Sequence, residues 1–391
     1  MIQEIRTLFP NLCPSRLVRV LSLGRRKVAM KKFNLDRQAD IIESVLSAHK
    51  IEGRVWGGTV TPRFVRFDLT TLLGTRVQKV LALREEVAMR LGVPDIRLYR
   101  KGDAIRVEVP RRDMAIVRFN VLRKNLRRLP WLTAILGVDE DGSPLLLKIT
   151  SPDVAHVLVA GATGSGKTVL LKNLVLSLAL YNPQSRLQLA IIDPKARGLI
   201  ALNDLPHLIR PVETEPEKAV QVLEGLVIEM ERRDRMKISR PAIVVVIDEL
   251  ADLRMVAGKR VETALTRLTQ RGREAGIHVI IATQRPAAAI VGGLIKANLP
   301  VRLVGAVTTP EDAKVATGIA ASGANRLRGR GDFLLIARQE TIRFQAAYTT
   351  DEEIRHIVRA ALPRWKRDGV AAHASSSTRK PQSRRAPSSH T

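Results

Sequence analysis

The strongest constraint on the fold is the segment HVLVAGATGSGKTVLLKNLVLSLAL, which starts at His156. An apolar run typical of a strand precedes GATGSGKT, residues 161–168, and an apolar run typical of a helix follows it. This octapeptide matches G-x-x-x-x-G-K-[ST] at every fixed position. Between a strand and a helix, such a loop surrounds phosphate groups with backbone amides. The sequence therefore predicts a nucleotide-binding P-loop; the alternative is a glycine-rich turn without a ligand.

Each residue type of the loop suits a phosphate ligand. The glycines let the backbone approach the phosphates, Lys167 reaches the β- and γ-phosphate oxygens, and Thr168 can ligate magnesium. The expected cofactors are ATP and Mg²⁺. The predicted nucleotide-binding residues are Gly161, Ala162, Thr163, Gly164, Ser165, Gly166, Lys167 and Thr168.

The whole chain has 391 residues, which suffice for two or three domains, and its segments differ in their pattern of apolar and polar residues. From residue 144 on, apolar strands alternate with helical segments, which favours an α/β fold with a parallel sheet covered on both faces. Residues 51–143 mix strand-like and helical patterns and predict a smaller α+β subdomain. Residues 1–50 form a basic N-terminal arm with a short amphipathic helix, and residues 364–391 form a disordered basic tail. The P-loop domain is thus expected at residues 144–363.

The amino-acid composition indicates which class of partner the chain binds. The chain has 65 Lys and Arg against 38 Asp and Glu, a formal charge of +27, which implies a polyanion such as nucleic acid or an anionic membrane surface. No apolar run approaches the 18 residues of a membrane span, and the N-terminus lacks the core of a signal peptide, so we expect a cytoplasmic protein. Aromatic residues are only 3%, which favours double-stranded over single-stranded DNA. A single cysteine, Cys13, and scattered histidines argue against a disulfide or a transition-metal site.

The segment PAIVVVIDELADL supplies two carboxylates at the end of an apolar strand. Asp248 is the candidate that holds magnesium, and Glu249 is the candidate base for the attacking water. The alternative for Glu249 is a cap on the following helix, where a carboxylate suits the helix dipole. The pair favours hydrolysis over transfer to a small molecule.

Polar and basic residues also flank the next strand, IHVIIATQRP. Thr283 and Gln284 end it, where Gln284 can sense the γ-phosphate; the alternative is an ordinary polar loop residue. Before it, KRVETALTRLTQRGREAG predicts a helix whose last turn exposes Arg271 and Arg273. Such arginines either stabilise a helix C-terminus or reach the nucleotide of a neighbouring subunit.

Together, HVLVAGATGSGKT, IIDPK, VVVIDELADL, LTQRGREAGIHVIIATQRP and GLIKANLPVRL closely resemble the motor of the FtsK/SpoIIIE DNA translocases. The resemblance runs from about residue 53 to residue 362, with LRGRGDFLL and TDEEI similar to the closing elements of that motor. It implies a RecA-like P-loop NTPase domain and a hexameric ring around double-stranded DNA.

The resemblance also implies roles for single residues. It makes Lys167, Asp248, Glu249, Gln284 and Arg273 the catalytic set, with Thr168 and Asp248 on the metal, Arg273 as the trans-acting arginine and Arg302 as a second candidate. It implies DNA contacts by Arg285, Lys296 and Lys314. We expect a homo-oligomer; a separate membrane anchor or a recombinase is a further partner that the resemblance leaves open.

Three departures from the family pattern limit the expectation. We expect the motor without the N-terminal membrane domain and without the C-terminal winged-helix module of typical members. Thr308, Thr309 and Pro310 stand where the pore segment often has S-S-K, which removes one basic contact.

The predicted function is therefore an ATP-dependent double-stranded DNA translocase of the chromosome segregation or cell division type. Two alternatives remain at this point: a conjugative or mobile-element DNA-transfer ATPase on the same fold, and a nucleotide-dependent DNA-binding scaffold without processive movement. A small-molecule kinase would leave the charge of +27 without a purpose.

Overall fold

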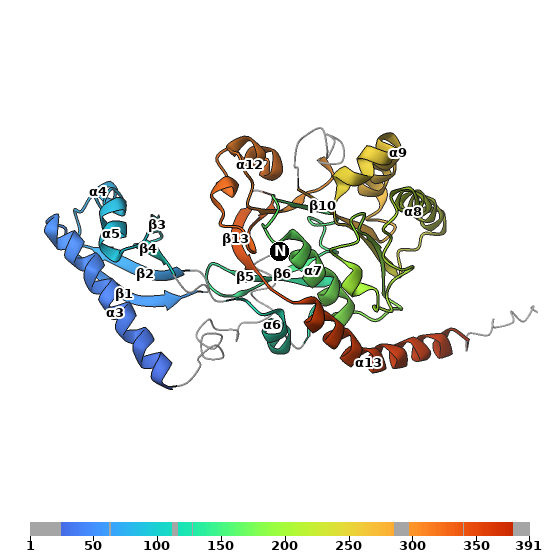
Figure 1. Ribbon diagram of the computed structural model, residues 1–391, viewed down its shortest axis with the longest axis horizontal. Helices are drawn as coiled ribbons and strands as arrows, with labels where there is room; N and C mark the ends of the chain where they lie inside the picture. Colours follow the sequence, from blue (N-terminus) through green and yellow to red (C-terminus); the bar gives the residue numbers. More distant parts are fainter. Residues whose placement is uncertain are drawn as a thin grey trace, which may run out of the picture. The chain divides into compact units, whose positions relative to one another are not determined.

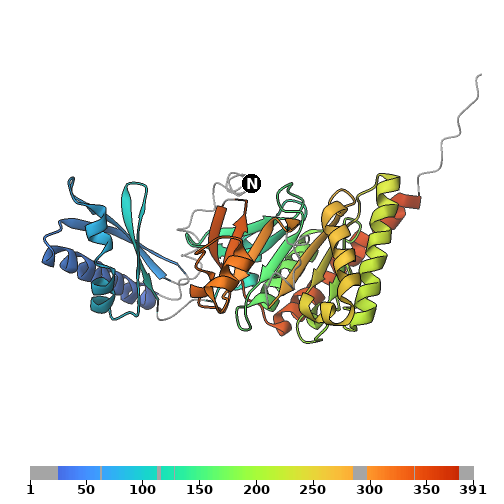
Figure 2. The ribbon, with the colours of Figure 1, turned by 90° about the horizontal axis from the view of Figure 1, so that it is seen from above.

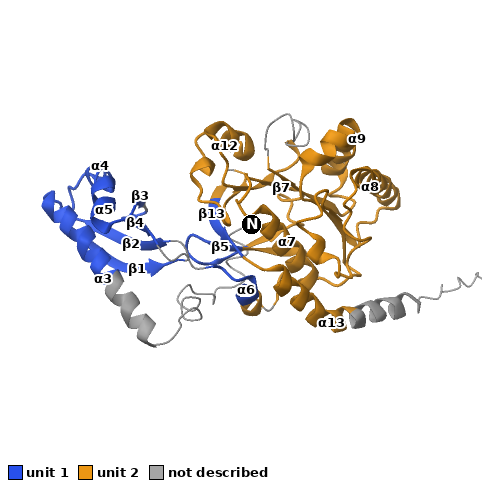
Figure 3. Ribbon diagram, viewed as in Figure 1, with its two compact units in different colours: residues 1–122, 137–145, 342–347 blue, residues 123–136, 146–341, 348–391 orange. Residues whose placement is uncertain are grey.

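The computed structural model describes residues 25–61, 64–111, 116–126, 128–284, 297–338 and 340–377. Within these ranges the chain forms two compact units (Figure 3). Unit 1 takes residues from the ranges 1–122, 137–145 and 342–347, and unit 2 from the ranges 123–136, 146–341 and 348–391. Each unit has its own hydrophobic core.

Unit 1 is built on a four-stranded antiparallel sheet in the order β1-β2-β4-β3. Its elements are α3 Arg25–Ala48, β1 Gly53–Val60, β2 Phe64–Thr71, α4 Val77–Leu81, α5 Arg84–Leu91, β3 Arg97–Lys101 and β4 Ala104–Pro110. Alternate strand residues such as Phe67 and Val107 point into one core, as the two-residue period of a strand requires. Ile42 and Leu46 of α3 complete that core. A helix from the predicted N-terminal arm therefore belongs to the α+β module.

Unit 2 is dominated by a mixed sheet of nine strands, of which residues 137–139, 144–145 and 342–346 are assigned to unit 1. The order is β6-β5-β13-β12-β11-β7-β10-β9-β8 (Figures 1 and 2). The strands are β5 Thr133–Asp139, β6 Pro144–Lys148, β7 Val157–Ala160, β8 Leu187–Ile192, β9 Ala242–Ile247, β10 Ile277–Thr283, β11 Val301–Gly305, β12 Asp332–Ala337 and β13 Glu340–Ala346.

The predicted α/β fold with a parallel sheet is confirmed for the centre of this sheet. Strands β11, β7, β10, β9 and β8 are parallel to one another. β12 is one of the apolar strands after residue 144, for which a parallel sheet was predicted, but it is antiparallel to β11. Its apolar residues did not reveal the direction, because a strand buried on both faces has the same composition in either orientation.

Helices cover both faces of the sheet. They are α6 Phe119–Asn125, α7 Lys167–Tyr181, α8 Pro216–Met236, α9 Leu250–Arg271, α12 Pro310–Thr317 and α13 Asp351–Ser377, with 3-10 turns η1 Ile200–Leu202 and η2 Ala324–Arg326. α8 and α9 lie side by side and share a core with alternate residues of β7 to β10 (Figures 1 and 2). α7 is joined to the segment leading into α13 through Asn173, which accepts a hydrogen bond of 2.6 Å from Thr349. In the described part of the chain, each helix is too short or too polar to cross a bilayer.

The units differ from the predicted domain ranges at two points. β5 begins at Thr133, inside the range predicted for the smaller subdomain, and all seven of its residues are buried. α13 runs through the boundary predicted after residue 363, and Trp365 beyond it is fully buried. The predicted disordered tail therefore begins with residues that belong to the fold; residues 378–391 lie outside the described residues.

The burial of Trp365 gives a test of this boundary. The indole packs edge-on against His207, with ring centroids 5.1 Å apart. We expect Trp365→Ala to lower the free energy of unfolding by about 3–5 kcal/mol, because it removes a large buried side chain and leaves a cavity. Met255→Ala, at a side chain that is 79% exposed, is the control and should change it by less than about 0.5 kcal/mol. Urea denaturation followed by circular dichroism measures both, and equal midpoints would contradict the packing of α13.

Candidate active site

The candidate site lies where three parallel strands end. β10 is hydrogen-bonded to β7 on one side and to β9 on the other. The P-loop follows β7, Gln284 follows β10, and Asp248 follows β9. Because parallel strands have their carboxyl ends at the same edge of the sheet, these three parts of the chain meet there. Ligands of open α/β sheets bind at this edge.

The three glycines of the P-loop adopt backbone conformations that other residues rarely reach. Gly161, Gly164 and Gly166 have φ values of 153°, 80° and 102°. Gly166 also lies against the backbone of Gly331, where a Cβ atom would come within 2.9 Å of the amide nitrogen. A side chain at residue 166 would therefore push the loop away from its support.

A distant segment supports the loop from outside the motif. We call residues 329–331, which precede β12, the brace. Arg330 N–H donates to the carbonyl of Gly164 (3.0 Å), and Gly331 N–H donates to that of Ser165 (2.8 Å). Because a peptide unit is planar and trans, the N–H of Gly166 points away from the brace. Sequence reasoning noted LRGRGDFLL only as a closing element and missed this contact.

Lys167 is folded back onto the loop. Its side chain is buried, and Nζ donates to the carbonyls of Gly161 (2.6 Å) and Ala162 (3.2 Å). Burial lowers the pKa of Lys167, while Glu249 and Asp248 oppose that shift. Both hydrogen-bond acceptors are neutral carbonyls, so an anion in the loop would offer the Lys167 ammonium a charged partner.

Thr168 and Asp248 are paired at the start of α7 and the end of β9. Thr168 Oγ1 lies 3.4 Å from Asp248 Oδ1. Burial, together with the nearby carboxylates of Asp193 and Glu249, raises the pKa of Asp248 to about 6. A hydroxyl and one carboxylate beside phosphate oxygens are the usual protein ligands of Mg²⁺. The donor set therefore fits a magnesium nucleotide, whose cation would relieve the repulsion among the carboxylates.

A turn after β8 packs directly on this pair and was not predicted as part of the site. Asp193 is fully buried, and its Oδ2 accepts hydrogen bonds from the backbone of Gly198 and Leu199, both at 2.8 Å. A Cβ atom on Gly198 would come within 2.8 Å of both Asp248 Oδ2 and Thr168 Cγ2. The turn therefore fixes the position of the two predicted metal ligands. The signal available in the sequence was the Asp of IIDPK followed by glycine five residues later.

Glu249 is the N-cap residue of α9 and is buried. Its carboxylate accepts a long hydrogen bond from Ala251 N–H (3.4 Å), so the predicted alternative, a helix cap, describes one of its contacts. It also accepts from the backbone N–H of Gln284, at 3.1 Å to Oε2 and 3.3 Å to Oε1. These bonds hold Glu249 at the carboxyl edge of the sheet, beside Asp248.

Gln284 connects this carboxylate with the P-loop. Its main-chain N–H contacts Glu249, and its side-chain Oε1 accepts a hydrogen bond of 2.8 Å from Thr163 Oγ1. The side chain therefore lies at the phosphate end of the loop. Five predicted residues, Lys167, Thr168, Asp248, Glu249 and Gln284, are thus brought together by the fold.

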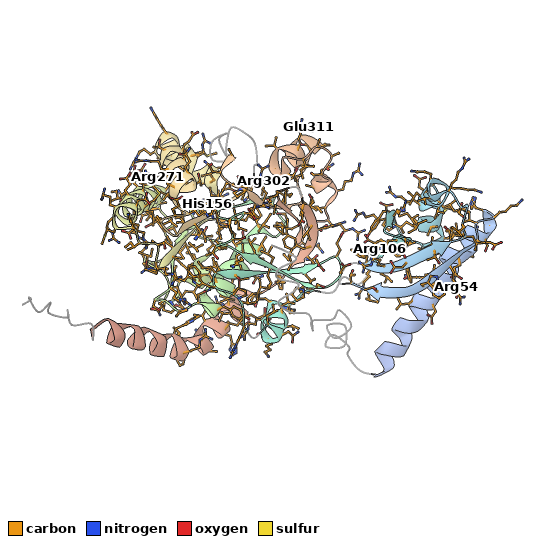
Figure 4. All side chains as sticks on the ribbon, turned by 180° about the vertical axis from the view of Figure 1, so that it is seen from behind. Arg54, Arg106, His156, Arg271, Arg302 and Glu311 are labelled. Carbon is orange, nitrogen blue, oxygen red and sulfur yellow. The ribbon has the colours of Figure 1, made fainter. Side chains whose placement is uncertain are left out.

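The candidate arginines lie elsewhere. Arg271 and Arg273 precede β10, and Arg302 is the second residue of β11. All three therefore lie toward the amino ends of strands that run parallel to β7, whose carboxyl end carries the P-loop. Arg271 and Arg302 are labelled in Figure 4. Arg271 forms an ion pair of 2.6 Å with Asp234. Arg302 is half-buried, and burial lowers its pKa. Arg273 is exposed. Their position at the opposite edge places none of them at the nucleotide site of their own chain.

Of the three predicted DNA-binding residues, Lys314 lies within the described part of the chain. Lys314 is exposed on α12, a short helix capped by Thr309, whose hydroxyl accepts from Asp312 N–H at 3.0 Å. Arg285 and Lys296 lie outside the described residues. Lys314 is therefore the one of the three whose surroundings the structure gives.

Comparison with known proteins identifies the family of these motifs. A family model described as FtsK/SpoIIIE family matches residues 120–239 and 234–288, and one described as FtsK alpha domain matches residues 18–111. DNA translocase FtsK of Staphylococcus epidermidis is 34% identical over 385 residues, which cover 90% of this chain and 48% of that protein. DNA translocase FtsK of Lactococcus lactis subsp. lactis is 34% identical over 361 residues, which cover 84% of this chain and 47% of that protein. The chain thus spans about half the length of the curated relatives it matches.

Solved structures show the same fold at lower identity. The pCW3 conjugation coupling protein TcpA, in a monomer form with ATPγS, has a TM-score of 0.57 and 19% identity, covering 84% of this chain and 99% of that one. The cytoplasmic domain of the Thermomonospora curvata type VII secretion ATPase EccC has a TM-score of 0.52 and 24% identity, covering 60% of this chain and 32% of that one. These likenesses establish a P-loop ATPase fold.

The contact of Gly198 with the predicted metal ligands can be tested by one methyl group. We expect Gly198→Ala to weaken magnesium-dependent nucleotide binding by about tenfold, because its Cβ would displace Asp248 or Thr168. Titration of a fluorescent ATP analogue with Mg²⁺ and with EDTA measures the effect. Gly225→Ala is the matched control, since a Cβ atom there meets nothing within 4 Å. Unchanged magnesium dependence in Gly198→Ala would show that the turn does not position these ligands.

Proposed function

This chain belongs to the FtsK/SpoIIIE family, and we propose on that basis that it is an ATP-dependent motor that moves along or pumps double-stranded DNA. The observation that carries the proposal is the meeting of Lys167, Asp248 and Glu249 at one edge of the sheet, with Arg273 at the other. This arrangement suits a hydrolytic site that a neighbouring copy completes.

The chain's own residues have distinct tasks at the nucleotide. When bound, ATP with Mg²⁺ supplies the phosphoanhydride and the charge neutralisation that hydrolysis requires. Lys167 would exchange its bonds to the loop carbonyls for bonds to phosphate oxygens. Thr168 and Asp248 would hold the metal, and the turn at Gly198 lies against both of them.

Glu249 is the base of the proposed reaction. Its buried carboxylate orients the attacking water and takes a proton from it. In the structure both of its oxygens are within hydrogen-bond distance of Gln284 N–H. The side chain of Gln284, bonded to Thr163 of the P-loop, can report on the γ-phosphate.

We propose that the site is shared between subunits of a hexameric ring. An arginine supplied by a neighbour stabilises the charge that develops on the transferred phosphoryl group. Arg273 is exposed and lies at the edge of the sheet opposite to its own P-loop, so it can serve the site of another copy. Arg271 and Arg302 are the weaker candidates, since one is ion-paired and the other is half-buried.

Duplex DNA is the proposed substrate, and the cytoplasm is the proposed location. The formal charge of +27 attracts phosphates whatever the base sequence, as a motor that travels along DNA requires. Lys314 together with Arg285 and Lys296 would contact the phosphates. A membrane anchor or a recombinase is a further proposed partner, to be sought by copurification.

Transfer of DNA by a conjugative or mobile element is the second candidate. The likeness to the coupling protein TcpA supports the fold at 19% identity and leaves the cargo open. Genes next to this one would separate the two roles. A scaffold that binds DNA without moving would fail to displace a triplex strand from a duplex track, whereas a motor displaces it.

Hydrolysis driven by DNA is the direct test of the motor. We expect duplex DNA to stimulate ATP hydrolysis by the wild type, and Glu249→Gln to lower the stimulated rate by about 10²–10⁴-fold while nucleotide affinity is kept. Lys167→Ala removes the phosphate-binding ammonium and is expected to lose both the DNA-stimulated hydrolysis and the nucleotide affinity. A phosphate-release assay gives the rates. Equal wild-type rates with and without duplex would refute the proposal.

The salt dependence of DNA binding tests Lys314. If its ammonium lies on a phosphate, Lys314→Ala should lower the slope of log affinity against log salt by about 1, equally for unrelated sequences. Lys259→Ala, at an exposed lysine of α9, is the matched control and should leave the slope unchanged. Fluorescence anisotropy at several salt concentrations measures both, and identical slopes would remove Lys314 from the DNA contacts.

A further inference from the structure

We propose that the buried Arg233 is a positioning residue for Arg273: it fixes the turn of residues 272–276 so that Arg273 is presented to the nucleotide site of a neighbouring copy. The inference rests on the proposed function, in which Arg273 acts in trans. Its basis is a set of hydrogen bonds that hold this turn from three elements of the chain.

The turn between α9 and β10 is closed by its own backbone. Ile277 N–H donates to the carbonyl of Gly272 (2.7 Å), and Gly276 N–H donates to that of Arg273 (3.1 Å). The carbonyl of Gly276 accepts from Ile243 N–H of β9 at 2.8 Å. The turn is therefore tied to the sheet at its far end.

The packing of the turn leaves no room at its last residue. Gly276 has a φ of 70°, and a Cβ atom there would come within 2.0 Å of the carbonyl oxygen of Ser239. Both the conformation and the contact require glycine. The last residue of the turn that carries Arg273 is thus held in one position.

Arg233 supplies the link between this turn and α8. Its side chain is 3% exposed, and Nη1 donates to the carbonyls of Ala275 (2.9 Å) and Pro241 (2.8 Å). Its Nε donates to Glu229 Oε1 at 2.7 Å. A buried guanidinium is costly unless it is paired and hydrogen-bonded, and here it has both kinds of partner. One of these partners, Ala275, is two residues from Arg273.

Two histidines beside the turn add support without charge. His278 hydrogen-bonds through Nδ1 to the carbonyl of Ala155 (2.9 Å), and His156 Nδ1 accepts from Val279 N–H (3.1 Å). Burial lowers the pKa of His156 to about 3, and burial likewise lowers the pKa of His278. Both rings are therefore neutral near pH 7. The exposed positive charge at this turn is therefore that of Arg273.

Rigid support matters because the stabilisation that an arginine gives to a developing charge depends on the distance between the two. A displacement of about 1 Å in a catalytic group can cost about 10²-fold in rate. Arg273 belongs to a turn, and loss of the bond from Arg233 to Ala275 would remove the support that lies two residues from it. The effect would fall on hydrolysis at the neighbouring site and leave nucleotide binding by the same chain intact.

Mixing of subunits tests this division. We expect Arg233→Met to bind a fluorescent ATP analogue with wild-type affinity and to lower duplex-stimulated hydrolysis at saturating ATP by about 10²-fold. Lys167→Ala is inactive because it does not hold the nucleotide, but its Arg273 turn is intact. In a ring with head-to-tail interfaces, equal mixing gives roughly a quarter of the sites a competent P-loop and an intact neighbouring turn. Activity should therefore reappear in the mixture of these two inactive variants.

The controls separate the inference from the function on which it rests. Arg232→Met is the matched control, because exposed Arg232 bonds to the same Glu229 and should keep wild-type activity. Arg273→Ala mixed with Lys167→Ala is the reference for action in trans. If that mixture recovers activity and the Arg233→Met mixture does not, the inference is overturned alone. If neither recovers, the trans arginine of the proposed function falls with it.

A folding defect is recognised separately. Should Arg233→Met lose nucleotide affinity or unfold, Arg233→Lys takes its place, since one ammonium keeps the charge but cannot reach all three acceptors. Partial hydrolysis with full nucleotide affinity, recovered by mixing with Lys167→Ala, supports the inference. Loss of affinity in Arg233→Lys as well would assign Arg233 to the stability of its own chain and overturn it.

Discussion

Three parallel strands, β7, β10 and β9, are hydrogen-bonded side by side, and their carboxyl ends carry the P-loop, Gln284 and the Asp248–Glu249 pair. The central strand decides the geometry of the site. Because β10 lies between the other two, residue 284 is adjacent to both, and one residue can contact Thr163 with its side chain and Glu249 with its backbone. The same strand directions put the residues before β10 at the opposite edge. The site and the arginine proposed to complete a neighbour's site are therefore two ends of one sheet.

The local parts of this arrangement could be predicted from the sequence. The P-loop is contiguous and has a fixed spacing, so the role of Lys167 follows from the motif alone. Asp248 was recognisable because it follows a run of apolar β-branched residues, where a carboxylate needs a partner. The α/β class followed from the same apolar runs. These features depend on residues that are close in sequence.

The rest depends on contacts between distant segments, and no local pattern encodes those. The brace at residues 329–331 lies far along the chain from the loop that it supports, and its contacts are made by backbone atoms, which every residue type shares. The direction of β12 and the inclusion of β5 in the large sheet were missed for the same reason. Arginine is a residue type that is usually exposed on helices, and only the fold shows that Arg233 is buried. Trp365 was assigned to a polar tail because its neighbours in sequence are polar.

The dependence of the phosphate loop on the brace has a consequence for truncated chains. A fragment that ends before residue 329 would retain the complete octapeptide GATGSGKT, its strand and its helix. It would lack the two amide donors that orient the carbonyls of Gly164 and Ser165. Such a fragment would still be recognised by its motif although its phosphate loop had lost this support, so in this protein an intact signature does not guarantee a competent nucleotide pocket.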